Sequence, residues 1–270
     1  MRRVVLVCLA TALLATTPAV AIVFGQPDGD RHPYVGAMFV KLGDGTLIPW
    51  CTGAMVSKRV FLTAGHCTYD AKAIHGPAGY ELGVTFVPDL GFDDPVPTFD
   101  ERDLVMGVGY THPAFVPNKD AADRRHVDVG VVVLERDPRV GRADLPSEGL
   151  LDSIDLKSAA FTTVGYGVAR DTKTGGQNSL YDDGLRRYAT QTASHLNPSW
   201  LKLSMNPSAG NGGTCYGDSG GPHLLGSGQA ETRTVVSVTS RGDAYCRSTD
   251  WTARVDTAAA LSFITSFIDN

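Results

Sequence analysis

The sequence predicts an all-β domain of the barrel kind, because short strand-like runs alternate with turn residues along most of its length. Apolar and β-branched residues form these runs at 56–63, 127–134, 159–166, 200–205 and 234–239. Clusters of turn-forming residues separate them, at 76–77, 94–97 and 210–213. With 270 residues, of which 43% are hydrophobic, the chain is long enough for one large domain or two fused half-domains with separate cores.

One helix is predicted, at the C-terminus over about 256–269. Asp256 is a suitable N-cap, and Leu261, Ile264 and Ile268 recur along one helical face. We expect that face to pack on the core. The polar, Gly-rich segment 171–183 is expected to be an exposed loop.

Residues 1–21 have the three parts of a secretory signal peptide. Arg2 and Arg3 supply the charged start, an apolar run covers 4–15, and small residues lead to Ala21, after which we expect cleavage. The apolar run, about twelve residues, is shorter than the roughly 20 that span a bilayer, which argues against a membrane anchor. We therefore expect a secreted, extracellular protein whose mature domain is 22–270.

The net charge argues against two classes of partner. The whole chain carries a formal charge of −5, and loss of Arg2 and Arg3 with the signal peptide makes it −7. Such a domain repels nucleic acid and anionic membranes, and no later stretch is apolar enough to cross a bilayer. We expect a soluble monomer with neither nucleic acid nor membrane as a partner.

Cysteine usage fits an oxidising compartment. The mature chain keeps four cysteines, Cys51, Cys67, Cys215 and Cys246, and an even number in a secreted protein predicts two disulfides. Zinc is the competing use, but no pair has the close Cys-x-x-Cys spacing of a structural zinc site. No metal or cofactor is therefore predicted.

Two short stretches carry residues that could do chemistry. In 61–67 a strand runs into a turn that holds His66 beside Cys67. A lone histidine is more often structural, but a Cys51–Cys67 bridge would fix its backbone and contribute up to about 3 kcal/mol in the loop-entropy description. In 128–134 Asp128 leads directly into an apolar strand. Alone this second pattern is weak, because an acid at a strand mouth can be a turn former.

A third stretch, 212–222, is more specific. Glycines stand on both sides of Ser219, and they would let the backbone turn sharply and expose the hydroxyl. Nearby amides would then point at one spot, as in an oxyanion hole. A phosphate-binding loop is the competing interpretation, but the lysine and following helix of such a loop are missing.

Together these stretches resemble the trypsin and chymotrypsin family of serine peptidases. Residues 22–25 (Ile-Val-Phe-Gly) are similar to its mature N-terminus, 62–67 to its histidine motif, and 217–222 to its serine motif. The order His, Asp, Ser also matches. The resemblance implies two six-stranded antiparallel β-barrels packed face to face, about 22–145 and 146–255, followed by the C-terminal helix. It also selects one cysteine pairing, Cys51–Cys67 with Cys215–Cys246.

The same resemblance implies an acyl-transfer mechanism, with His66, Asp128 and Ser219 as catalytic triad. Ser219 would attack the scissile carbonyl, His66 would move the proton, and Asp128 would orient His66. The amides of Gly217 and Ser219 would hold the oxyanion. Ser237 is matched to the family serine that hydrogen-bonds the buried aspartate, and Val238 then stands where tryptophan is usual.

Activation is implied in the same way. In the family the new N-terminal amine, here that of Ile22, pairs with the aspartate before the serine, here Asp218. Because the predicted signal peptide ends directly at Ile22, signal cleavage alone is expected to give active enzyme.

The specificity pocket is assigned by counting along the family pattern. Gly213 falls on the pocket floor with Thr214 beside it, so strict trypsin specificity is not expected. Asp250 falls near the pocket base and Thr239 at its entrance. The expected preference is mixed: medium apolar side chains are accepted, lysine is tolerated through Asp250, and Thr239 disfavours the largest aromatics. The competing reading leaves Asp250 outside the pocket.

The predicted function is thus a secreted serine endopeptidase acting on proteins or peptides. A secreted serine esterase is one alternative, since the same acyl chemistry serves both. A non-catalytic binding or adhesion module is another, and the tripeptide at 241–243 (Arg-Gly-Asp) is the motif that suggests adhesion. The natural substrate and any controlling protein inhibitor are left open.

Overall fold

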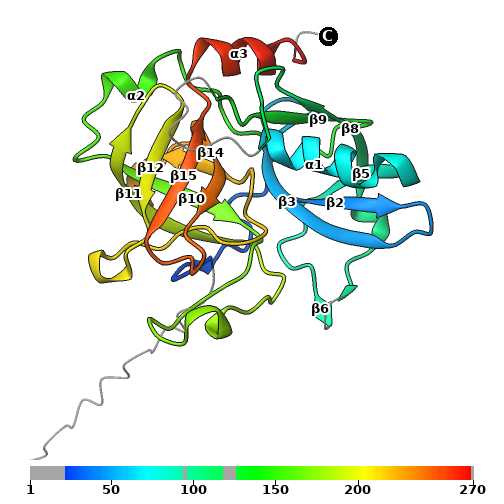
Figure 1. Ribbon diagram of the computed structural model, residues 1–270, viewed down its shortest axis with the longest axis horizontal. Coiled ribbons are helices and arrows are strands. Elements are labelled where there is room, and N and C mark those ends of the chain that lie inside the picture. Colours follow the sequence, from blue (N-terminus) through cyan, green and yellow to red (C-terminus); the bar gives the residue numbers. More distant parts are fainter. Residues whose placement is uncertain (1–21, 94–95, 118–125, 269–270) are drawn as a thin grey trace, which may run out of the picture.

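The structure is a computed structural model that describes residues 22–93, 96–117 and 126–268. Two barrels lie side by side, the first in the blue to green part of the chain and the second in the lime to orange part (Figure 1). The predicted signal peptide, 1–21, lies outside the described residues. The fold class predicted from the sequence, two six-stranded antiparallel barrels, is confirmed.

The first barrel is closed by six antiparallel strands, in the order β2-β3-β4-β9-β8-β5. The strands are β2 (Val35–Leu42), β3 (Leu47–Met55), β4 (Val60–Thr63), β5 (Tyr80–Thr85), β8 (Val105–Thr111) and β9 (Gly130–Leu134). Phe39, Phe61 and Val131 are fully buried in its interior. The predicted run 127–134 becomes a strand only from Gly130, which leaves Asp128 at the strand mouth.

The second barrel follows the order β11-β10-β13-β14-β15-β12, and pairing of β12 with β11 closes it. The strands are β10 (Ala160–Gly165), β11 (Arg187–Leu196), β12 (Trp200–Ser204), β13 (Pro222–Leu225), β14 (Val235–Gly242) and β15 (Thr249–Arg254). Strand β14 runs further than the predicted run 234–239. Its pairing with β15 is interrupted between Thr239 and Arg241, and this bulge matters for the site described below.

Several shorter elements connect or edge the barrels. The strand β1 (Gln26–Pro27) pairs with β11, so the first described residues lie on the second barrel rather than on the first. The remaining pieces are β6 (Phe92–Asp93), β7 (Val96–Pro97), α2 (Leu150–Ser153), η1 (Gly76–Ala78), η2 (Glu101–Asp103), η3 (Gly176–Ser179), η4 (Pro207–Ala209) and η5 (Gly228–Ala230). The predicted loop 171–183 contains only η3 as regular structure.

The C-terminal helix α3 (Ala258–Thr265) is shorter than predicted, and Asp256 does not cap it. Thr257 is the N-cap, because its side chain accepts from the amide of Ala260. The Asp256 carboxylate is instead fully buried, where Arg254 and the Leu151 amide donate to it. Beyond the helix, Phe267 packs against Tyr110 of β8, with ring centroids 4.8 Å apart, so this end of the chain returns to the first barrel.

A second helix, α1 (Gly65–His75), was not predicted. It follows β4 directly, so His66 lies in a first helical turn and not in an open turn. Both predicted disulfides are formed, Cys51–Cys67 between β3 and α1 and Cys215–Cys246 between two loops of the second barrel. No helix among the described residues has the length and apolar character needed to cross a membrane.

A buried ionic cluster holds the N-terminal segment against the second barrel. His32 faces two carboxylates, with Asp28 at Nδ1 and Glu231 at 2.9 Å from Nε2. The Arg186 guanidinium donates to Asp28 at 2.8 Å and to the carbonyl of Gly29 at 2.6 Å. Burial opposes charging of Asp28, but the hydrogen bonds and charges of His32 and Arg186 leave its pKa lowered. Burial likewise opposes charging of His32, whose pKa is nevertheless raised by its two acids.

We expect Asp28→Asn to lower the free energy of unfolding by about 3–5 kcal/mol at pH 7, because it leaves buried cations unpaired. Folding lowers the pKa of Asp28, so its contribution is full above the unfolded pKa, about 3.9. That contribution is lost as pH falls through the lower folded pKa. Denaturant unfolding at several pH values measures both effects. Asp30→Asn, at an exposed position two residues away, is the control, and equal stability of the two variants would contradict the assignment.

Candidate active site

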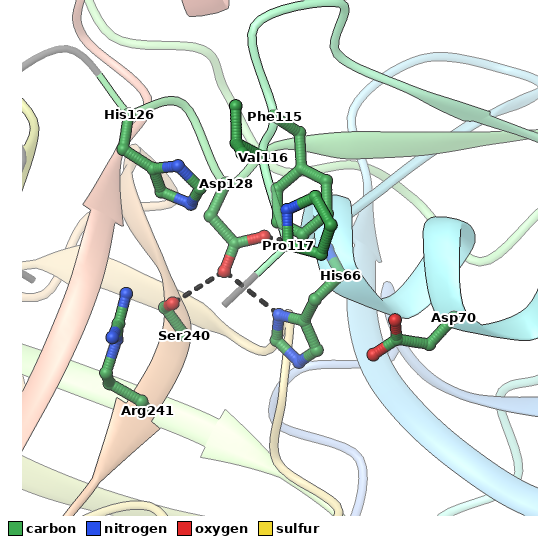
Figure 2. A pocket seen from close by; sticks show the side chains of 9 residues that line it. All are labelled: His66, Asp70, Phe115, Val116, Pro117, His126, Asp128, Ser240 and Arg241. Atoms are coloured by element: carbon green, nitrogen blue, oxygen red, sulfur yellow. Dashed lines mark hydrogen bonds and ion pairs between the residues drawn. The ribbon is translucent and has the colours of Figure 1, made fainter. Parts of the chain in front are cut away.

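The buried Asp128 carboxylate brings together three elements at the junction of the barrels (Figure 2). Its Oδ1 accepts the backbone amide of His66 at 2.7 Å, at the start of α1. Its Oδ2 lies 2.9 Å from Nδ1 of His66 and accepts the hydroxyl of Ser240, on β14, at 2.5 Å. The imidazole is thereby held in one orientation, with Nε2 left on the side away from Asp128.

These contacts set the charges of the pair. Burial by itself raises the pKa of Asp128, but the charge of His66 and the hydrogen bonds from His66 and Ser240 bring it to about 2. For His66, burial lowers the pKa, and the charge and hydrogen bond of Asp128 outweigh this and leave it raised. Asp128 is therefore a carboxylate at neutral pH, and His66 is a stronger base than an isolated histidine.

Ser219 lies close to this pair, across the disulfide. The Cys67 sulfur is 3.7 Å from Nε2 of His66 and 3.6 Å from the carbonyl oxygen of Ser219. That carbonyl also accepts the amide of Thr52 at 2.8 Å, which ties the serine loop to the first barrel. Within the described residues no hydrogen bond joins the Ser219 hydroxyl to His66. The serine is half-buried and lines a pocket together with Ser240.

The loop before Ser219 leaves two amides unused. Gly217 has a φ of +95°, a conformation that side-chain-bearing residues rarely adopt. Its carbonyl is turned away and accepts the Thr52 hydroxyl at 3.0 Å. The amides of Gly217 and Ser219 donate to no acceptor among the described residues. Both are thus free to donate to an oxygen that carries developing negative charge.

Asp218, the residue between Gly217 and Ser219, is fully buried. Among the described residues, no hydrogen bond joins it to Ile22. Its carboxylate accepts the amides of Gly167 at 2.7 Å and Cys215 at 2.8 Å. Burial raises its pKa to about 7, against the effect of those two amides. Ile22 is also fully buried, and the next residue, Val23, pairs with Gly213.

Ser237 does not hydrogen-bond the buried aspartate, so that part of the sequence interpretation was wrong. Its hydroxyl accepts from Thr252 at 2.8 Å inside the second barrel, and Ser240 takes the expected role. Counting along a regular strand fails here because β14 contains the bulge between Thr239 and Arg241. Val238, which was matched to the position where tryptophan is usual, is fully buried, and Arg241 is the residue that follows Ser240.

The primary pocket opens beside Ser219 and has a volume of about 250 Å³. Its lining residues are Thr214, Cys215, Tyr216, Ser219, Thr239, Ser240, Arg241, Gly242, Asp243 and Cys246. Thr214 and Thr239, both predicted to contact substrate, are among these lining residues.

Gly213 and Asp250 are not in that lining, which corrects their predicted placement. Asp250 is fully buried and accepts from Gln191 at 3.1 Å. A Cβ on Gly213 would lie 2.3 Å from Cγ of Met205, so this position packs against the barrel interior. A lysine side chain in the pocket would meet the two threonines before it met Asp250.

A second cavity of about 250 Å³ adjoins the first through Ser240 and Arg241, which line both. Its other lining residues, shown in Figure 2, are His66, Asp70, Phe115, Val116, Pro117, His126 and Asp128. We call the two cavities together the groove; His66 lines one of them and Ser219 the other. Neither Asp70 nor Phe115 was singled out from the sequence, because no motif marks either position. Arg241 was noted only as part of the Arg-Gly-Asp tripeptide.

Two further sequence features have structural explanations. The Asp243 carboxylate of the Arg-Gly-Asp tripeptide accepts the amides of Ser248 and Thr249, so it is engaged within its own loop. Cys51, His66 and Cys67 place potential metal-ligand atoms within 4.8 Å of one another. The two sulfurs are joined in a disulfide, and so they are not thiolate donors.

We expect Ser240→Ala to lower kcat/KM of the predicted peptidase activity at least about tenfold. The variant removes a hydrogen bond to a charged group, and such bonds contribute about 1.5–3 kcal/mol. Ser237→Ala removes a fully buried hydroxyl from the same strand, and it should leave kcat/KM within about twofold of wild type. Steady-state kinetics on one peptide substrate compares them, and a larger loss in the Ser237 variant would restore the original assignment.

Comparison with known proteins identifies the family. The sequence matches the family model described as Trypsin over residues 22–262. It is 29% identical over 245 residues to chymotrypsin from Phaedon cochleariae, covering 86% of this chain and 77% of that protein. It is 25% identical over 241 residues to CLIP domain-containing serine protease B15 from Anopheles gambiae, covering 83% of this chain and 63% of that protein. The chain thus spans just under two thirds of the second relative's length.

Solved structures agree on the fold. HL collagenase superposes with a TM-score of 0.63 at 17% identity, covering 92% of this chain and 99% of that chain. HBP gives a TM-score of 0.61 at 16% identity, covering 92% and 97%. Because the family match extends over nearly all of the described residues, the chain belongs to the trypsin family of serine proteases.

Proposed function

We propose that this protein is a secreted serine endopeptidase that hydrolyses peptide bonds in proteins through an acyl-enzyme intermediate. One observation carries the proposal: His66 is held by Asp128 at 2.9 Å beside Ser219, in a groove where two amides of the serine loop have no acceptor. This combination supplies a base, its orienting group, a nucleophile and oxyanion donors in one place.

The reaction proceeds in two halves. A carbonyl group in the groove is attacked by the Ser219 hydroxyl, whose proton passes to Nε2 of His66. The imidazolium that forms is stabilised by the Asp128 carboxylate, and its proton then goes to the leaving amine, which breaks the peptide bond. Water repeats the sequence on the acyl-enzyme and releases the second product.

The oxyanion of each tetrahedral intermediate is bound by the amides of Gly217 and Ser219. Loss of one such donor in another protease costs roughly 3–4 kcal/mol in the transition state. The fixed loop keeps both amides oriented before substrate arrives, since Thr52 holds the carbonyls of Gly217 and Ser219 from the first barrel. No reorganisation is then needed as the charge develops.

Secretion is supported by the two disulfides, since disulfides persist in oxidising compartments. Activation is proposed to follow from cleavage before Ile22. The free amine would bring a cation to Asp218, a buried carboxylate that has two amide donors among the described residues. Such a pair would order the oxyanion loop from within.

A serine-directed phosphonate should label the secreted protein stoichiometrically at Ser219, and Ser219→Ala should not react. The labelled product, sequenced from its N-terminus, should begin at Ile22. Mass spectrometry of intact protein and of its peptides measures both. A folded protein that takes no label is a binding module, and a labelled protein that cleaves esters but no peptide in a library is an esterase.

The pH dependence of kcat/KM should be bell-shaped. His66 acts as a base only when neutral, and its raised pKa places the acid limb above 6.5, the value of an isolated histidine. The Ile22 amine must be charged, and pairing with Asp218 raises its pKa above the reference value of about 7.7 to 8.0. Its contribution is therefore full below that value and is lost as pH rises through the raised pKa. Full activity and an unchanged alkaline limb in Asp218→Asn would refute the pairing.

A further inference from the structure

A buried polar cluster lies behind the primary pocket, and the catalytic scheme uses none of it. It consists of His223 on β13, Asp250 on β15 and Gln191 on β11, each fully buried. Polar groups in a protein interior cost free energy unless they bond one another. The hydrogen-bond partners of these three side chains therefore show which neighbouring residues the cluster orients.

The cluster reaches the pocket through two threonines that line it. The Nε2 atom of His223 lies 3.0 Å from the Thr239 hydroxyl and 3.5 Å from Oδ2 of Asp250. Gln191 donates to the same Oδ2 at 3.1 Å. The Thr214 side chain also interacts with the Asp250 carboxyl and favours its charged form. Each threonine thus has one side toward the cluster and the other toward the pocket.

The described residues place no fixed cation in the cluster. Burial lowers the pKa of His223 to about 3, so the imidazole is neutral. Burial raises the pKa of Asp250 to about 7, against the effects of Gln191 and Thr214. Asp218 is a further acid that interacts with the cluster, because the charge of Asp250 contributes to the raised pKa of Asp218. The cluster behind the pocket therefore has a net charge between zero and minus one near pH 7, carried by Asp250.

The position of the His223 proton follows from its partners. Nδ1 has no hydrogen-bond partner among the described residues, whereas Nε2 faces the Thr239 oxygen. A buried N–H without an acceptor is rarer than a buried acceptor without a donor, so the proton belongs on Nε2 and is donated to Thr239. The Thr239 oxygen then accepts from His223, and the single hydrogen of its hydroxyl is available to a different acceptor.

We propose that His223 is a positioning residue for substrate selection. By donating to Thr239, it leaves the Thr239 hydroxyl as a hydrogen-bond donor in the primary pocket. That donor selects an uncharged substrate side chain that ends in an acceptor oxygen, namely a carboxamide such as glutamine. The Thr214 hydroxyl, engaged with Asp250, offers its lone pairs to the amide NH₂ of the same side chain. This inference rests on the proposed peptidase function and names the residue preceding the cleaved bond, the P1 residue.

Charged P1 side chains fit this pocket less well. A lysine ammonium would lose its hydration without direct contact to Asp250, which is fully buried and outside the lining. A glutamate could accept from Thr239, but it would approach the partly charged Asp250. An apolar side chain of similar length makes the same packing contacts and leaves the Thr239 hydrogen unbonded.

The test compares four peptide substrates that differ only at P1, with glutamine, norleucine, lysine or glutamate, at pH 7. We expect kcat/KM for glutamine to exceed that for norleucine roughly tenfold, the scale of one net hydrogen bond. Lysine and glutamate should both fall below glutamine. Phosphonate labelling of each preparation reports whether the active site itself works, which separates failure of this inference from failure of the proposed function.

Variants then locate the cause of the preference. His223→Leu should bring the glutamine to norleucine ratio down to about one, and Thr239→Val should do the same while keeping the shape of the side chain. His223→Gln should restore much of the ratio, because its amide NH₂ can donate to Thr239 as Nε2 does. Thr85→Val, at a buried and unpartnered threonine of the first barrel, is the control and should keep the wild-type ratio.

Three results would overturn the inference. The first is a glutamine to norleucine ratio near one in wild type. The second is a tenfold ratio that survives both His223→Leu and Thr239→Val. The third is lysine preferred over glutamine and lost in Asp250→Asn, which would mean that Asp250 itself binds a substrate cation. A glutamine to norleucine ratio that is lost in His223→Leu and restored in His223→Gln supports the inference. If the histidine were merely structural, restoring a hydrogen-bond donor alone would not restore the ratio.

Discussion

The whole site depends on the hydrogen bonds to one buried carboxylate, that of Asp128. Its donors come from the start of α1, from the His66 ring and from Ser240 on β14. The first two belong to the first barrel and the third to the second. The carboxylate therefore fixes the imidazole and also joins the two halves of the groove. The positive end of the α1 dipole adds to this, because the His66 amide belongs to the first helical turn.

The serine loop is held against that junction by close backbone packing, which explains why it contains so many glycines. A Cβ on Gly220 would lie 2.0 Å from the Thr63 hydroxyl, and one on Gly221 would lie 2.8 Å from the Val164 carbonyl. The first contact is with the first barrel and the second with the second barrel. Side chains at these positions would separate the barrels or displace Ser219. The glycines therefore fix the distance between nucleophile and base as much as they allow the turn.

Short motifs drew attention to His66, Asp128 and Ser219, because each lies in a local pattern. Their roles came from the resemblance to the trypsin and chymotrypsin family, since the Asp128 pattern alone is weak. Five of the twelve described barrel strands, β4, β9, β10, β12 and β14, overlap runs marked from the sequence, since alternation and turn residues act over a few positions. The other seven were not marked. Helix α1 was missed because its buried residues, Cys67, Thr68 and Ala71, make only a weak apolar stripe. The Ser240 role was missed because a bulge changes which residues of β14 face Asp128. Asp250 was misplaced because counting across loops of unusual length gives a position along the chain and no depth within the fold.

Three buried acids in this protein show how donors decide the charge of a carboxylate when burial does not. Asp128, Asp218 and Asp250 are all at most 2% exposed, so desolvation penalises their charged forms to a similar degree. Asp128 has the ionisable imidazole of His66 as a partner and two further donors, and its pKa is about 2. Asp218 has two neutral amides and Asp250 chiefly Gln191 and Thr214, and both have a pKa of about 7. Neutral donors thus leave a buried acid poised near physiological pH, where a nearby cation or a rearranged hydrogen bond can change its charge. The first condition applies to Asp218 if the Ile22 amine reaches it. The second applies to Asp250, which among the described residues is connected to the pocket lining by Thr214 and, through His223, by Thr239.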